Sequence, residues 1–177
     1  AAFERTELFG QFSSKYDYYL KTCLDAGGGK DDCAKGDGIA ATSVGPTIFS
    51  GQEWVGMQLF MNEEDGGAKC VLCHVADWTD DPGNVVVPTW SPDGSIPPVF
   101  TDFTYDNLGV PKNLENPFYY LPQAFNRDGK NFVDYGLGPV VGDEDENGKH
   151  KVMTLRNIGL TAPYSHNGLF KTLKDIT

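Results

Sequence analysis

The sequence CVLCH at residues 70–74 constrains this chain more than any other stretch. Two cysteines separated by two residues, with a histidine directly after the second, are the attachment sequence of a c-type haem. On a helical turn Cys70, Cys73 and His74 share one face, so both thiols and the imidazole can meet one planar ligand. We expect the two sulfurs to bond one covalent haem c, and His74 to be the proximal ligand of its iron.

Other uses of two nearby cysteines remain open. A redox dithiol also has C-x-x-C, but it lies in a strand-helix context that nothing around residue 70 indicates. A structural zinc site needs a second pair of ligands, and Cys23 with Cys33 is the only candidate pair. The nine residues between them are too many for a zinc knuckle, so haem attachment is the favoured interpretation.

Glycine and proline are frequent in this chain, with 21 and 11 residues among 177. This composition predicts long, turn-rich connections, and the length fits a single domain. We therefore expect residues 1–177 to form one c-type haem domain that is mainly α, a cytochrome c-like fold with few helices and long irregular loops. No run of 18 apolar residues occurs, which excludes a membrane-spanning helix.

The formal net charge of −11 limits the partners of the chain. The phosphate backbone of a nucleic acid would be repelled by this surface, so we expect no nucleic-acid binding. A basic protein partner suits the charge, and plain solubility is the simpler explanation of it.

Cys23 and Cys33 bracket the polar, glycine-rich stretch LDAGGGKDD. A disulfide between them would close this loop and stabilise the fold by about 3 kcal/mol on the loop-entropy estimate. Thioether-bound haem and a disulfide both indicate a periplasmic or otherwise extracytoplasmic location. Two surface thiols without a disulfide are the alternative, and no signal peptide is visible in the sequence.

The first part of the chain is expected to be helical. Residues 1–21 predict an amphipathic helix that leads into the domain, with apolar side chains for one face at Phe3, Leu8, Phe9 and Phe12. Residues 22–51 are polar and Gly-rich, and we expect an irregular loop insertion there. Residues 52–177 would then form the haem-binding core.

A second helix is predicted to follow Ser50, because Glu53 stands three places later and completes a capping box. Its apolar positions are spaced for one inward face, at Trp54, Met57 and Phe60 or Met61. A turn at residues 63–67 would then deliver the chain to the CVLCH motif.

After His74 the sequence is rich in proline and glycine as far as residue 122. We expect loops there, with short extended pieces at residues 85–87 and 99–103. A last helix is predicted to begin at Ser165 or Asn167 and to run through Leu173 and Ile176. Both ends of the sequence lie inside predicted helices, which is typical of a piece of a longer polypeptide.

Several blocks of the sequence resemble the bacterial dihaem cytochrome c peroxidase and MauG family. They are FTDFTYDNLGVPKN at 100–113, DYGLGPVVGD at 134–143 and KVMTLRNIGLTAPYSHNGLFKTL at 151–173. AAFERT at the start is similar to the helix that leads from the first haem domain of that family into the second. The resemblance spans residues 1–12 and 52–177, whereas the insertion with Cys23 and Cys33 and the loop at 77–99 are less typical.

The resemblance implies that the chain is the second, C-terminal haem domain of a two-haem protein. In that family this haem transfers electrons, and hydrogen peroxide is reduced at the haem of the preceding domain. A small electron-donor protein and a second haem domain or redox protein are the implied partners. Two alternatives stay open: a non-enzymatic electron-carrier subunit of a larger redox assembly, and a MauG-like oxidase that modifies a partner protein.

The sixth ligand of the iron is not evident from the chain. Met153 is the only methionine after the attachment motif and is the candidate from composition. The family instead places its distal Met or Tyr about fourteen residues after the histidine of the TAPYSHNG block, which implies a ligand past Thr177. Met153 is therefore the second choice, and an apolar role in the haem pocket is the simpler explanation.

Five further residues carry expectations of their own. The resemblance places the backbone carbonyls of Thr161 and Pro163 at a calcium ion between two haem domains, whereas a simple turn is the alternative. Arg156 is a candidate partner of a haem propionate or of a structural carboxylate, because guanidinium pairs with carboxylate. His166 would hydrogen-bond near the distal side of the haem or simply pack, and His150 is expected at the surface.

Overall fold

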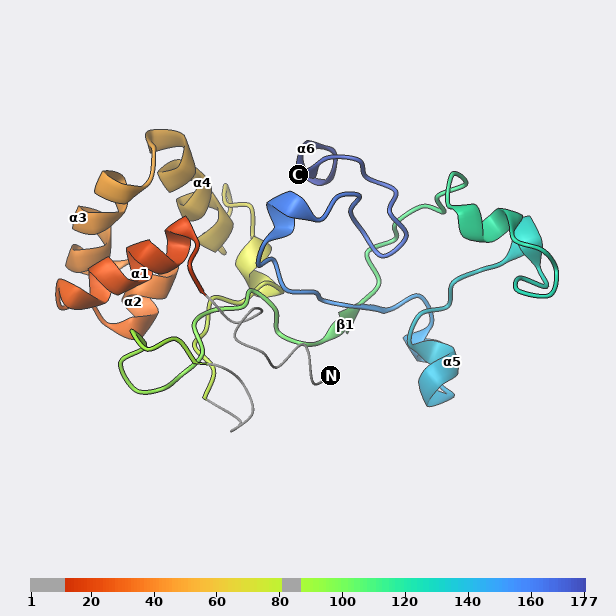
Figure 1. Cartoon of the computed structure of the whole chain (residues 1–177), viewed down its shortest axis with the longest axis horizontal. Helices are drawn as coiled ribbons and strands as arrows, with labels where there is room; N and C mark the ends of the chain where they lie inside the picture. The colour runs from red at the N-terminus through yellow and green to blue at the C-terminus, as the bar shows by residue number, and fades with distance from the viewer. Residues whose placement is uncertain (1–11, 81–86) are drawn as a thin grey trace. The chain divides into compact units, whose positions relative to one another are not determined.

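The computed structural model describes residues 12–80 and 87–177 (Figure 1). The chain divides into two compact units, Ala1–Asp102 and Phe103–Thr177.

Four short helices provide the core of the first unit. They are α1 (Lys15–Asp25), α2 (Lys30–Lys35), α3 (Gly38–Ile48) and α4 (Gly51–Met61), drawn in red to ochre in Figure 1. Their common core consists of fully buried side chains, namely Tyr19, Leu20, Cys23, Cys33, Ala34 and Ala41. Small residues in α2 and α3 let these helices lie close to α1.

The expected irregular insertion at residues 22–51 is wrong, because this range contains the end of α1 and all of α2 and α3. Cys23 and Cys33 join α1 to α2, since their Sγ atoms lie 2.02 Å apart, at disulfide-bonding distance. Packing against α1 therefore orders two helices whose Gly-rich sequence does not predict them. Helices this short depend on tertiary contacts for most of their stability.

The start of α1 also differs from the expectation of a helix through residues 1–21. The described helix begins at Lys15, because Ser14 accepts a hydrogen bond from the Asp17 N–H and Asp17 accepts one from the Ser14 N–H. This capping box fixes the first turn, and Phe12 lies outside the helix with a φ of 41°. Phe3, Leu8 and Phe9 lie outside the described residues.

The prediction for the helix after Ser50 is confirmed. The Ser50 side chain accepts from the Glu53 N–H, and the Glu53 carboxylate accepts from the Ser50 N–H at 2.7 Å. The four apolar residues of the predicted face pack against the core of the unit: Trp54, Met57, Phe60 and Met61.

Apart from a 3₁₀ turn at Cys70–Leu72, the remaining residues that the structure describes in the first unit are loop. Thr79 and Ile96 form an isolated antiparallel bridge, and the Trp78 indole N–H donates to the Lys30 carbonyl at 3.1 Å. Residues 99–103 are not the extended piece that we expected, because Phe100 and Phe103 adopt left-handed φ values of 57° and 62°. The other expected piece, at 85–87, lies mostly outside the described residues.

The second unit contains little regular structure. Strands β1 (Tyr105–Asp106) and β2 (His150–Lys151) pair antiparallel, with Tyr105 opposite Lys151 and Asp106 opposite His150. The helices are α5 (Gly138–Val141) and α6 (Leu173–Ile176). The single 3₁₀ turns of the unit are Pro117–Tyr120, Gly129–Asn131, Glu144–Glu146 and Ile158–Leu160.

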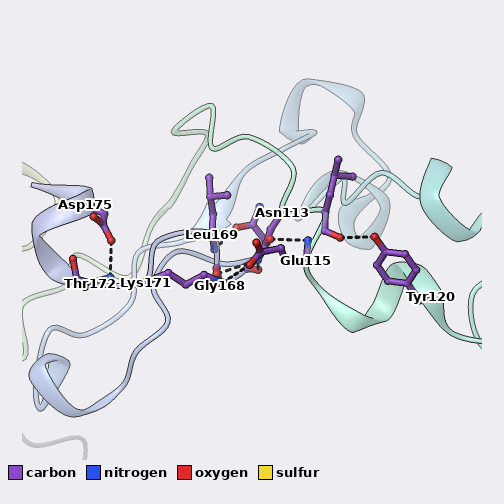
Figure 2. Close-up of polar contacts among 10 residues, drawn as sticks. Asn113, Glu115, Tyr120, Gly168, Leu169, Lys171, Thr172 and Asp175 are labelled. Carbon is purple, nitrogen blue, oxygen red and sulfur yellow. Dashed lines mark hydrogen bonds and ion pairs between the residues drawn. The ribbon is translucent and has the colours of Figure 1, made fainter.

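The last helix is shorter than expected, because it begins at Leu173 and not at Ser165 or Asn167. Asn113 holds the preceding loop by donating from its amide to the carbonyls of Asn167 (3.1 Å) and Gly168 (3.0 Å), as Figure 2 shows for Gly168. Thr172 then caps the helix, and its backbone N–H donates a hydrogen bond to the Asp175 carboxylate at 2.8 Å (Figure 2).

The mainly α, cytochrome c-like fold class is confirmed, with helices dominating and strands few. Within residues 12–80 and 87–177, no helix has the length and apolar character needed to cross a membrane.

Candidate haem attachment site

The CVLCH motif is tied to the end of α4 by backbone hydrogen bonds. The N–H of Ala68 donates to the Leu59 carbonyl at 2.8 Å, and that of Lys69 donates to the Asn62 carbonyl at 3.2 Å. A side chain on Gly67 would overlap with Asn62, so only glycine allows this turn to close. The capped helix α4 therefore sets the position of Cys70.

The motif itself forms one tight helical turn. Cys70–Leu72 is a 3₁₀ turn, and the His74 N–H donates to the Cys70 carbonyl at 2.9 Å. Val71 is 5% exposed and packs into the core, whereas Leu72 is 54% exposed. Cys70, Cys73 and His74 are all partly accessible. The turn thus brings both thiols and the imidazole together in the first unit.

The segment around Phe100 determines which nitrogen of His74 is available. His74 Nδ1 lies 2.9 Å from the Phe100 carbonyl oxygen. A carbonyl can only accept, so Nδ1 carries a proton, and in the neutral ring Nε2 then keeps the lone pair. The Asp102 N–H donates to the Cys73 carbonyl at 3.0 Å and holds this segment against the motif. A donated Nδ1 proton is the usual arrangement of a metal-binding histidine.

The chemistry of this site fits a covalent haem. Two thiols on one turn can form thioethers, and a neutral histidine with a free Nε2 can bind iron. Cys23 and Cys33, the other candidate zinc ligands, lie at bonding distance from each other. They are fully buried, so they do not supply a second ligand pair for zinc.

The other predicted site residues belong to the second unit. Met153 is 60% exposed, and Thr161 and Pro163 are exposed as well. Arg156 is half-buried, and its backbone N–H donates to the Thr154 hydroxyl oxygen at 3.1 Å.

The two remaining histidines lie together, which the sequence did not indicate. The rings of His150 and His166 stack with centroids 3.6 Å apart and an angle of 6° between planes. Burial lowers the pKa of His166, and a positive charge on His150 would lower it further. Asp134 completes a cluster with both rings. Asp134, His150 and His166 come from three segments that are distant in the sequence, and backbone pairing is seen between the first two of them.

No family model matches the chain. Among curated proteins, it is 38% identical over 77 residues to methylamine utilization protein MauG of Paracoccus denitrificans, covering 42% of this chain and 18% of that protein. It is 28% identical over 156 residues to cytochrome-c peroxidase IdrP2 of a Pseudomonas species, covering 82% of this chain and 33% of that protein.

The chain is thus similar to dihaem cytochrome c peroxidases and to MauG. It spans a third or less of the length of these two relatives, with 18% of the first and 33% of the second. This similarity agrees with the geometry of the CVLCH turn, in which the His74 ring bonds to a carbonyl through Nδ1.

A solved structure has the same fold. The chain resembles a variant of the diheme peroxidase BthA from Burkholderia thailandensis, with a TM-score of 0.58 and 22% identity. The match covers 97% of this chain and 32% of that one. The likeness therefore covers residues of both units.

Proposed function

We propose that the chain is an electron-transfer haem c domain, the C-terminal one of two in a periplasmic dihaem peroxidase-like protein. Cys70 and Cys73 hold the haem covalently, and His74 Nε2 is the proximal ligand. When bound, the haem supplies one-electron chemistry. The second haem domain would reduce hydrogen peroxide, and a small donor protein would deliver electrons.

One observation carries this proposal. The hydrogen bond from His74 Nδ1–H to the Phe100 carbonyl, at 2.9 Å, orients the ring and selects its tautomer beside both thiols. A histidine that merely packed on the core would not need this arrangement next to two cysteines on one turn. The relatives named peroxidase and MauG support haem chemistry of this kind.

The attachment is tested by producing the protein with a cytochrome c maturation system. We expect the wild type to gain the mass of one haem for the CVLCH motif, and Cys70→Ala/Cys73→Ala to lose that covalent haem. His74→Ala should lower haem loading and change the ferric absorption spectrum, because the proximal nitrogen is removed.

His150→Gln is the matched control, because it replaces another of the three histidines in this sequence and lies outside the motif. Its haem loading and spectrum should equal those of the wild type. Haem that stays covalently bound after both cysteines are replaced would contradict the assignment.

The other residues near the proposed haem have defined tests. We propose that Arg156 pairs with a propionate, so Arg156→Gln should change the reduction potential while Arg127→Gln should not. We also propose that Met153 is not the distal ligand, because the family that the sequence resembles has its distal ligand about fourteen residues after the position of His166. Met153→Leu should leave the ferric spectrum and its methionine-ligation band, if present, unchanged.

Calcium is a second proposed ligand. The backbone carbonyl oxygens of Thr161 and Pro163 would coordinate the calcium ion, because hard cations prefer oxygen ligands. Chelation of the full protein should slow electron transfer between the two haems, and added calcium should restore it. An inter-haem rate that is insensitive to calcium would argue against this site.

Two other functions are compared by activity. A non-enzymatic carrier would show no peroxide turnover in the full protein, although the haem of this chain would still cycle between its redox states. A MauG-like oxidase would consume peroxide only together with oxidation of a partner protein. The 38% identity to MauG over 77 residues is the observation that supports the MauG-like oxidase as a candidate function.

A further inference from the structure

Asp134, His150 and His166 form a cluster of possible metal ligands in the second unit. One donor atom from each lies within 4.8 Å of the donor atoms of the other two. The residues stand far apart in the sequence and come from three separate segments. None of them belongs to the haem attachment motif.

Backbone pairing holds Asp134 beside His150. The N–H of Gly148 donates to the Tyr135 carbonyl at 2.8 Å, and that of Leu137 donates to the Lys149 carbonyl at 2.9 Å. Gly136 adopts a left-handed φ of 57°, and a side chain there would overlap with the Lys149 carbonyl. Glycine at this position is therefore required for the two segments to lie so close.

A second set of bonds holds the loop that carries His166. Tyr164 and Phe170 form an antiparallel bridge across this loop. The Asn113 amide donates to the carbonyls of Asn167 and Gly168, the two residues that follow His166 (Figure 2). Asn113 is 7% exposed, so these bonds are protected from water. The cluster thus rests on backbone that is fixed independently of any metal.

The donor set favours a borderline metal ion. Imidazole nitrogen with carboxylate oxygen suits Zn²⁺, Cu²⁺ or Ni²⁺, whereas Ca²⁺ and Mg²⁺ prefer oxygen alone. Three protein ligands leave a fourth position for water, as in open zinc sites. One Asp134 oxygen accepts a hydrogen bond from the Gly136 N–H at 3.0 Å. This bond orients the carboxylate and leaves its other oxygen available as a metal ligand.

The fit requires a small movement. Metal bonds of about 2.0–2.2 Å place tetrahedral donor atoms about 3.3 Å apart, which is closer than the 4.8 Å limit that encloses the cluster. The parallel rings would also have to tilt, so that both nitrogens point to one ion. Asp134 and His166 are exposed, so these side chains can move and an ion can enter from solvent.

We propose that Asp134, His150 and His166 bind one divalent transition-metal ion, Zn²⁺ or Cu²⁺ in the test. Its donors include imidazole nitrogens, so they are of a different class from the carbonyl oxygens of Thr161 and Pro163. Bound metal would join three distant segments of the second unit.

The test uses the haem-loaded protein after chelator treatment, titrated with Zn²⁺ in a calorimeter. We expect one additional ion per chain in the wild type. His150→Gln and His166→Gln should each weaken Zn²⁺ binding by about tenfold or more, because even residues that only support ligands have effects of about 10–100-fold. Asp134→Asn should weaken it too, whereas Asp128→Asn, the charge-matched control, should not.

Electron paramagnetic resonance of Cu²⁺ provides a readout that loss of folding does not imitate. The wild type should show coupling to two nitrogens, and either histidine variant should show one. Unchanged haem spectra and melting temperatures would establish that the variants are folded. Absence of Zn²⁺ binding in the wild type, or equal binding by all three variants and the control, would overturn the proposal.

Discussion

The side chain of Tyr19 is fully buried among Tyr16, Phe49 and Trp54, with ring centroids 5.1 to 6.0 Å away. Its hydroxyl has no hydrogen-bond partner among the residues that the structure describes. Tyr16, one turn earlier, donates its hydroxyl to the Ala34 carbonyl at 2.8 Å. Two neighbouring tyrosines of α1 are therefore in opposite hydrogen-bonding situations.

This contrast predicts opposite effects of removing each hydroxyl. Tyr19→Phe should leave the free energy of unfolding unchanged or raise it by about 1 kcal/mol, because an unsatisfied buried group is removed. Tyr16→Phe should lower it by about 1 kcal/mol, because the Ala34 carbonyl loses its donor. Urea unfolding of both variants checks the pair, and a large loss in Tyr19→Phe would reveal a partner for that hydroxyl.

Tyr19 also predicts a loss of stability in alkali. Burial, and secondarily the negative charge of Asp37, raises its pKa from 10.0 to about 12. The unfolded chain then loses the proton first, so stability is full below about pH 10 and declines as the pH rises toward 12.

The measurement is the urea midpoint between about pH 9 and pH 11. Tyr19→Phe should show a smaller decline than the wild type over this interval. Tyr18→Phe is the control, because Tyr18 is 64% exposed. An equal decline in all three proteins would contradict the role of Tyr19.

At the level of elements, α3 and α4 approach each other through a glycine. A Cβ atom added at Gly45 of α3 would overlap with the ring of Trp54 in α4. Trp54 itself packs on Tyr19 and stacks on Phe49 at 6.2 Å. The position of α4, which precedes the CVLCH motif, therefore depends on the absence of a side chain at Gly45.

Gly45→Ala is expected to destabilise the protein by about 1–3 kcal/mol, because overpacking outweighs the gain in helix propensity. Gly56→Ala in α4 is the matched control, since nothing lies within 4 Å of the added Cβ. That variant should gain about 0.5–1 kcal/mol. Thermal unfolding compares the two, and stabilisation by both would mean that Trp54 moves aside freely.

The disulfide between Cys23 and Cys33 links α1 to α2, and we expect it to affect the stability of the whole first unit. The two positions are 10 residues apart and both are fully buried. Replacing both by alanine should lower the free energy of unfolding by about 3 kcal/mol, because the unfolded chain regains the entropy that closure of a loop of this length removes.

Denaturant unfolding of the double variant measures this loss. Wild-type protein unfolded in the presence of a thiol reductant should approach the variant, whereas thioether bonds to haem should survive the reductant. A wild-type curve that is insensitive to reductant after full unfolding would show that the two cysteines are not bonded.

Across the molecule, local sequence signals predicted the elements that local chemistry stabilises. Ser50 and Glu53 cap α4 as their spacing indicates, and CVLCH forms a turn in which His74 bonds back to Cys70. The family resemblance followed from blocks around that one motif. These features depend on residues within a few positions of one another, which is the range that a sequence pattern reports.

Only the tertiary structure decided the remainder. Helices α2 and α3 form in a Gly-rich stretch because small residues pack on α1, and their short length gives no periodic signal. The Phe100 carbonyl that selects the His74 tautomer lies 26 residues from that ring. Asp134 lies beside His150 through backbone pairing between segments, and His166 joins them from a third segment. Backbone groups and long-range pairings carry no residue-specific pattern, so the sequence determined the haem motif, and the fold determined its surroundings.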